Sequence, residues 1–223
     1  MTPHPPLVPN APHPELDELI AVLERLRAPG GCVWDREQTH ASLVQYLVEE
    51  AFELVDAIEA GSREELIEEL GDVLYQVIFH ADIAAEAGEF TLEDVARHMR
   101  EKMVARHPHV FGDVTASTSD DVVATWEAVK AVEKSHRTSV LEGIPQGMPS
   151  LALADKTLGR AAKVGVVREA AVIPSTEQEL GEELLATVVA AKAAGLDSER
   201  ALRGALRALQ FEVRAAEAAR AGE

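Results

Sequence analysis

The chain has 223 residues, of which 47 % are hydrophobic and only 4 % aromatic, a balance that favours a helical bundle over sheets. Its formal net charge of −18 argues against nonspecific binding to nucleic acid or to an anionic membrane, because both require basic surface. The lone Cys32 excludes an intrachain disulfide, and there is neither a long apolar run nor the apolar core of a signal peptide. We therefore expect a cytoplasmic protein without membrane contact.

Helical periodicity accounts for most of the chain as far as His136. Residues 1–14 contain six prolines and little to bury, which predicts a disordered leader. Apolar residues then recur at helical spacing until Pro29-Gly30-Gly31, and the loop after these glycines carries Trp34. The expected helices span about Glu15–Arg27, His40–Ala60, Ser62–Ala87, Thr91–Arg106 and Ser119–His136.

Two acidic segments flank a predicted turn at Gly61. Glu53 and Glu69 each lie 8 residues from this glycine, and Glu50 and Asp72 each lie 11 residues from it. In an antiparallel helical hairpin, residues equally far from the turn lie at the same height. The i, i+3 spacing within each helix places both of its carboxylates on one face. The sequence therefore predicts that four carboxylates converge.

Glu50 interrupts an apolar stripe, and Glu69 has an apolar residue one turn to either side. Partly buried carboxylates without a partner are costly and repel one another, and a bound cation would remove both costs. Oxygen ligands without Cys or His suit Mg²⁺, with Mn²⁺ as a substitute. The alternative is a solvated acidic face, to which we assign Glu59, Glu64, Glu65 and Glu68. Glu49 fits either interpretation.

These acidic segments resemble the signature of the MazG-type nucleoside triphosphate pyrophosphohydrolases. The pattern is Glu-Glu-x-x-Glu before the predicted turn and Glu-x-x-Asp after it, supported by the segments 31–35 and 106–111. The resemblance spans about residues 16–136, and Val33 departs from it where the family usually has proline. It implies an all-α, Mg²⁺-dependent enzyme that cleaves nucleoside triphosphates to monophosphate and pyrophosphate. The acidic hairpin alone would equally fit a phosphatase or a divalent-cation buffer.

The resemblance also implies roles for particular residues. Metal ligands would be Glu50, Glu53, Glu69 and Asp72, and the catalytic carboxylates would be Glu49, Glu50 and Glu53. Glu49 would orient the attacking water or complete a second metal site. Nucleotide contacts would come from Lys102, Arg106, Trp126 and Lys130. Spacing alone would instead make the lysines surface residues and Trp126 a core residue.

Histidines are less informative. Glu37-x-x-His40 and Glu133-x-x-His136 match the ligand spacing of di-iron bundles, but one lies beside a loop and the other in a polar helix end. We interpret this spacing as chance and expect His80 and His98 to be structural.

The C-terminal half resembles a degenerate copy of the first half. Glu179-Leu180-Gly181-Glu182 repeats the second acidic segment, and the same alignment places Arg160 and Lys163 where the first pair of glutamates stands. We expect an all-α bundle built on the acidic antiparallel hairpin, followed by a non-catalytic helical repeat that packs or dimerises. The expected divisions are a leader at 1–14, a catalytic domain at 15–136, a linker at 137–149 and the repeat at 150–223. The expected assembly is a homodimer, and the rival interpretation is a catalytically silent helical scaffold.

Overall fold

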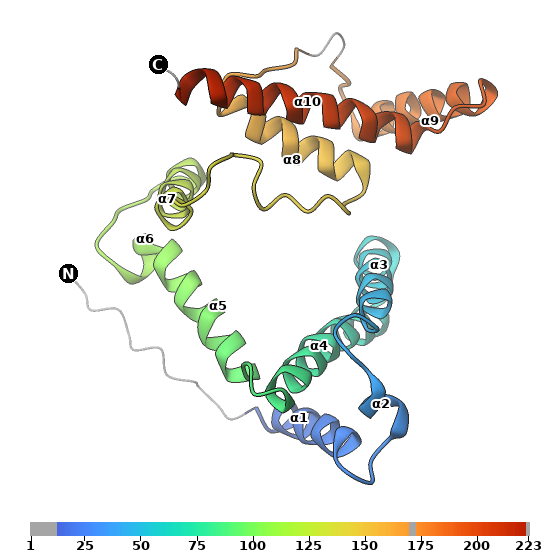
Figure 1. The fold of residues 1–223 in the computed structure, drawn as a ribbon, viewed down its shortest axis with the longest axis vertical. Helices are drawn as coiled ribbons and strands as arrows, with labels where there is room; N and C mark the ends of the chain where they lie inside the picture. Colours follow the sequence, from blue (N-terminus) through green and yellow to red (C-terminus); the bar gives the residue numbers. More distant parts are fainter. Residues whose placement is uncertain (1–12, 170–172, 222–223) are drawn as a thin grey trace. The chain divides into compact units, whose positions relative to one another are not determined.

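The computed structural model describes residues 13–169 and 173–221, and these residues form ten helices and no strand (Figure 1). The predicted all-α fold class is confirmed. The predicted leader lies outside the described residues except for its last two. Among the described helices, none is both long and apolar enough to cross a membrane. The chain divides into two compact units, residues 1–131 and 132–223.

The first unit contains the predicted helices and two short additional ones. Its elements are α1 (Pro14–Arg27), α2 (Val33–Glu37), α3 (Val44–Ala60), α4 (Arg63–Glu86), α5 (Leu92–Arg106), α6 (Pro108–Phe111) and α7 (Ser119–Glu133), the last ending at the boundary with the second unit. The segment around Trp34, predicted as a loop, forms α2. The next helix begins at Val44 instead of His40, because Thr39 and Ser42 exchange side-chain and backbone hydrogen bonds of 2.9 and 3.1 Å that favour a turn.

The turn between α3 and α4 depends on Gly61 through steric contact. Its backbone is extended, with φ −81° and ψ 169°, so a left-handed conformation is not the reason for glycine here. A Cβ atom at this position would lie 2.7 Å from the carbonyl oxygen of Ala57. The predicted capping box is confirmed: the Ser62 hydroxyl accepts from the backbone of Glu65, and the Glu65 carboxylate accepts from the backbone N–H of Ser62.

A small core and one buried arginine join α1, α2 and α4. The core contains Leu23, Leu43, Ile78 and Phe79. Arg27 is 8 % exposed and donates from Nε to Asp82 at 2.5 Å and from Nη1 to the carbonyl oxygen of Asp35 at 2.6 Å. The guanidinium also lies 5.3 Å from the centre of the Phe79 ring. These contacts tie the segment that follows α1 to the helix that carries two of the candidate carboxylates.

The second unit has its own core. It contains α8 (Ser150–Ala162), α9 (Glu177–Ala193) and α10 (Ser198–Ala221), with α8 and α9 each in contact with α10. The buried core residues are Leu141, Ile144, Leu153, Ala161, Leu206, Leu209 and Val213. Two of them, Leu141 and Ile144, come from the segment that the sequence suggests as a linker.

Candidate active site

Three carboxylates from α3 and α4 meet at one place. Glu50 on α3 and Glu69 and Asp72 on α4 each offer an oxygen atom, and these oxygens lie within 4.8 Å of one another. Glu53 is not part of this group of three, but it lies close enough for its charge to raise the pKa values of both Glu50 and Glu69. The structure therefore brings together three of the four residues for which the sequence predicts a metal-binding role, with Glu53 beside them.

Neighbouring carboxylates raise the pKa values of two members of this group. Partial burial, followed by the charge of Asp72, raises the pKa of Glu50 above its ordinary value of 4.5. Partial burial, followed by the charge of Glu53, raises the pKa of Glu69 in the same way. The pairs Glu50–Asp72 and Glu53–Glu69 each lie equally far from the turn at Gly61, and α3 and α4 are in contact.

A hard divalent cation fits this group of residues. Oε2 of Glu69 is buried and has no hydrogen-bond partner, so the structure leaves one acceptor unsatisfied beside other negative charges. A buried unpaired acceptor is costly, and neighbouring carboxylates raise the cost further. An ion coordinated by several carboxylate oxygens would satisfy the acceptor and neutralise the repulsion.

The open surface beside the carboxylates faces the turn. A hollow of about 320 Å³ is lined by Glu53, Asp56, Ala57, Ala60, Gly61, Glu65 and Glu69. Glu49 is exposed on α3, and its charge contributes least among the causes that raise the pKa of Glu50. Glu49 thus borders the cluster without belonging to its closest group.

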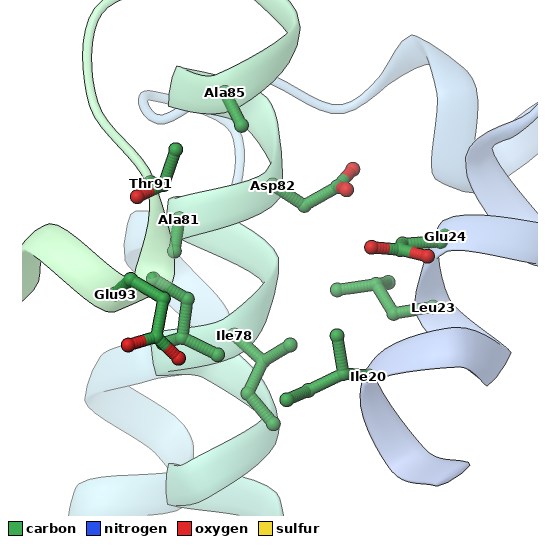
Figure 2. A pocket seen from close by; sticks show the side chains of 10 residues that line it. Ile20, Leu23, Glu24, Ile78, Ala81, Asp82, Ala85, Thr91 and Glu93 are labelled. Carbon is green, nitrogen blue, oxygen red and sulfur yellow. The ribbon is translucent and has the colours of Figure 1, made fainter. Parts of the chain in front are cut away.

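A second hollow lies on another side of α4 and has a different character (Figure 2). It measures about 250 Å³ and lies between α1, α4 and the start of α5. Figure 2 shows Ile20 and Leu23 opposite Ile78, with carboxylates at the edge. The lining is mainly apolar, and it contains none of the four candidate ligands.

Of the predicted nucleotide-binding residues, which lie on α5 and α7, Arg106 and Trp126 are in contact. The Arg106 guanidinium lies 5.1 Å from the centre of the Trp126 ring, and the His107 ring meets the same indole edge-on at 5.1 Å between ring centroids. Lys130 forms a 3.0 Å ion pair with Glu127, and Lys102 is half-buried one turn before Arg106. The contact between Arg106 and Trp126 joins two helices, so the spacing within either helix gives no sign of it.

In the second unit, the side chains that the sequence aligns with the acidic segments have local roles. Glu179 accepts from the backbone N–H of Ser175 at 2.7 Å, at the start of α9, and Glu182 accepts from Gln178 at 3.0 Å. Arg160 donates to the carbonyl oxygen of Val140 at 2.9 Å. Across the described part of this unit, no three acidic, His or Cys side chains converge as Glu50, Glu69 and Asp72 do.

Sequence reasoning missed polar residues farther along α4. Oε1 of Gln76 and Nε2 of His80 are buried without a hydrogen-bond partner. Nδ1 of His80 lies 2.7 Å from Nδ1 of His40, which precedes α3. The available signal was their spacing: Gln76 and His80 lie two and three helical turns beyond Glu69, which places all three on one helical face.

The fold and the carboxylate group define an all-α protein with an acidic cluster of the kind that binds divalent metal ions. Residues 38–111 match the MazG nucleotide pyrophosphohydrolase domain. The nucleoside triphosphate pyrophosphohydrolase/pyrophosphatase MazG of Thermotoga maritima is 40 % identical over 210 residues, which cover 86 % of this chain and 81 % of that protein. The chain therefore belongs to the MazG family.

Two further relatives extend the similarity over most of the chain. The nucleoside triphosphate pyrophosphohydrolase of Escherichia coli K12 is 38 % identical over 217 residues, covering 86 % of this chain and 82 % of the relative. An uncharacterized 26.1 kDa protein of Streptomyces cacaoi is 48 % identical over 211 residues, covering 93 % and 85 % respectively. The similarity to these relatives thus includes much of the C-terminal unit as well as the acidic hairpin.

Proposed function

We propose that the protein hydrolyses nucleoside triphosphates to nucleoside monophosphate and pyrophosphate in a Mg²⁺-dependent reaction. The observation that carries this proposal is the convergence of Glu50, Glu69 and Asp72 within 4.8 Å, with a buried and unpaired oxygen on Glu69. Family membership selects cleavage between the α- and β-phosphates, because the carboxylates alone would suit other phosphate chemistry. The cellular role would be control or cleansing of the nucleotide pool in the cytoplasm.

The metal ligands in this proposal are Glu50, Glu53, Glu69 and Asp72, with Mn²⁺ able to replace Mg²⁺. When bound, the ion supplies the positive charge that a polyphosphate requires and makes nearby water more acidic. The carboxylates would hold the ion, and without it their own charge would repel a triphosphate. Glu49 is exposed beside Glu50 and would act as the base that orients and deprotonates the attacking water.

The remaining substrate contacts would come from α5 and α7. Lys102 and Lys130 would bind phosphate oxygens, and Arg106 would add a planar group able to form two hydrogen bonds. The half-buried indole of Trp126 would stack on the nucleobase. The contact between Arg106 and Trp126 supports this assignment, because it holds a cation and an aromatic ring at the same place.

A second copy of the chain is the proposed partner. The face of α3 directed away from α4 exposes Val44, Val48, Phe52 and Val55, whose exposed fractions run from 44 to 57 %. These residues recur at helical spacing along most of α3, and continuous apolar surface of this kind marks an interface. In a two-fold symmetric dimer this face of one subunit would pack against the same face of the other.

Phe52→Glu should therefore convert a dimer into a monomer, as measured by size-exclusion chromatography with light scattering. A monomeric wild-type protein would overturn the proposed dimer.

Product analysis tests the reaction. With Mg²⁺ and a nucleoside triphosphate, the purified protein should release monophosphate and pyrophosphate in equal amounts. Release of orthophosphate and diphosphate would overturn cleavage between the α- and β-phosphates. Absence of any product from all four common ribonucleotides and deoxyribonucleotides would instead favour the silent scaffold.

A further inference from the structure

Arg106 and His107, at the end of α5, both contact the indole of Trp126 although they are adjacent in the chain. Consecutive residues of a helix point about 100° apart, so within a regular helix two such side chains would not meet one group. The chain bends here because of Pro108, whose ring disfavours helical geometry in the preceding residue. His107 accordingly has φ −120° and ψ 55°, ends α5 and precedes α6. The bend brings the His107 ring to the same indole as the Arg106 guanidinium.

One hydrogen bond holds the His107 ring in place. In a continuing helix the carbonyl oxygen of Met103 would accept from the backbone N–H of His107, but this N–H donates to Val104 at 3.3 Å instead. Nδ1 of His107 lies 2.6 Å from the Met103 oxygen. Because a carbonyl oxygen can only accept, Nδ1 carries the hydrogen and donates it. The side chain thus caps the end of α5, and the bond fixes the orientation of its ring.

The His107 ring meets the indole of Trp126 in a favourable geometry. The ring planes lie at 77° and the centroids are 5.1 Å apart, an edge-on arrangement within the preferred range of aromatic pairs. Trp126 is half-buried, so part of its ring remains in contact with solvent. A half-exposed side chain exchanges between rotamers, and a ligand that needs one of them must order it on binding. The contact with His107 restricts this exchange before a ligand arrives.

We propose that His107 is a positioning residue that holds the indole of Trp126 ready to stack on the nucleobase. This role rests on the proposed stacking at Trp126 and adds the residue that orients the indole. His107 acts without touching the substrate: its bond to Met103 orients the imidazole, and the imidazole orients the indole. Such preorganisation improves affinity because it lowers the cost of ordering the site on binding. It acts only on ligands that carry a base, because a bare polyphosphate has nothing to stack on Trp126.

Two substitutions separate the ring of His107 from its hydrogen bond. His107→Asn keeps an N–H donor near the position of Nδ1, so the cap of α5 is retained, but it removes the ring that meets Trp126. His107→Phe keeps a ring at this position and removes the donor. His98→Asn is the matched control, because it makes the same chemical change at an exposed residue earlier on the same helix.

Calorimetric titration in the presence of Mg²⁺ measures the effect on binding. The probes are the α,β-methylene analogues of the common ribonucleoside triphosphates, whose carbon bridge prevents cleavage, and inorganic tripolyphosphate, which has no base. For the analogue that wild type binds most tightly, His107→Asn should raise Kd about threefold to tenfold, as expected for loss of one aromatic pair. Its Kd for tripolyphosphate should change by less than about twofold, and His107→Phe and His98→Asn should stay within about twofold of wild type for every probe.

A spectroscopic measurement reports on the indole directly. The chain has 2 tryptophans, so Trp34→Phe leaves Trp126 as the single one. In this background the near-ultraviolet circular dichroism of Trp126, which requires fixed tertiary packing, should fall in His107→Asn and persist in His107→Phe. The far-ultraviolet spectrum of each variant should match wild type, which shows that the helices are intact.

The results distinguish failure of the positioning role from failure of the proposed function. Equal Kd values for wild type and His107→Asn would overturn the positioning role. A parallel rise in Kd for the analogues and for tripolyphosphate would also overturn it, because His107 would then only support the end of α5. So would a loss of affinity in His107→Phe as large as that in His107→Asn. Absence of pyrophosphate release by wild type would overturn the proposed hydrolysis, whereas a nucleotide Kd that depends on the His107 ring would still support the positioning of Trp126.

Discussion

Glu50, Glu53, Glu69 and Asp72 are individually ordinary carboxylates, and their unusual property is that they are close together. The pKa values of Glu50 and Glu69 are raised, with partial burial as the largest cause and the charge of a neighbouring carboxylate as the next. Without an ion, this arrangement stores repulsion in the folded state, a common cost of a functional site. With an ion, the same oxygens become ligands. The site residues should therefore affect stability with opposite signs in the absence and presence of Mg²⁺.

Glu53→Gln tests this change of sign, because the amide keeps the shape and removes the charge. In EDTA the variant should melt at a higher temperature than wild type. As Mg²⁺ is added, the free energy of unfolding of wild type should rise by RT ln(1 + [Mg²⁺]/Kd), which is about 2.7 kcal/mol at one hundred times Kd. The variant should lose most of this stabilisation. Thermal melts of both proteins across a Mg²⁺ titration should therefore converge or cross. A variant that is less stable in EDTA and gains the full shift would make Glu53 a structural residue.

Glu65 has the opposite electrostatics, although it lies on the same helix. The Glu65 carboxylate accepts a hydrogen bond from the backbone N–H of Ser62. This hydrogen bond is the largest of the causes that lower the pKa of Glu65 below 4.5. A lowered folded-state pKa means that the stabilising effect of the charge is complete above pH 4.5 and is lost as pH falls through the folded-state value. Glu65→Gln should thus lower the melting temperature at pH 7, and the difference from wild type should shrink below pH 4.5. Glu64→Gln, one residue earlier and without this cap, should show no such pH dependence.

At the level of elements, the hairpin of α3 and α4 is where the sequence was most informative. The spacing around Gly61 and the cap at Ser62 are local signals, and the spacing predicted that Glu50, Glu69 and Asp72 lie close together, as they do. The start of α3 at Val44 follows from the local hydrogen bonds between Thr39 and Ser42, but the contact between His40 and His80 depends on how distant segments pack. Sequence periodicity contains no information on such contacts, so the region preceding α3 was predicted least well.

Gly61→Ala tests the steric account of the turn. The added Cβ would lie 2.7 Å from the Ala57 carbonyl oxygen, so the variant should lose about 1–3 kcal/mol, a typical cost of forcing extra atoms into a packed site. Gly71→Ala is the matched control in the same hairpin, because a Cβ there meets nothing within 4 Å. Inside a helix this change should stabilise by about 0.5–1 kcal/mol. Chemical denaturation in EDTA measures both. Equal effects of the two substitutions would contradict the close contact at the turn.

At the level of the whole molecule, the two units differ in what they retain. The first unit brings three carboxylates together, whereas in the second unit Glu179 caps a helix start and Arg160 bonds to backbone. We propose that the two units are related by an alignment of Glu179 with Glu69, in which Arg160 and Lys163 stand where the first unit has Glu50 and Glu53. We propose that the second unit supports the fold or the assembly without a metal site of its own.

The central claim is that the acidic hairpin of the first unit alone holds the ion at which nucleoside triphosphates are cleaved. One assay of Mg²⁺-dependent pyrophosphate release tests it, using Glu50→Gln and Asp72→Asn against the double variant Glu179→Gln, Glu182→Gln. The first two variants should lose turnover by several orders of magnitude while keeping wild-type helicity by circular dichroism. The double variant should keep the wild-type rate. Retained turnover in Glu50→Gln and Asp72→Asn, or its loss in a folded double variant, would contradict the account.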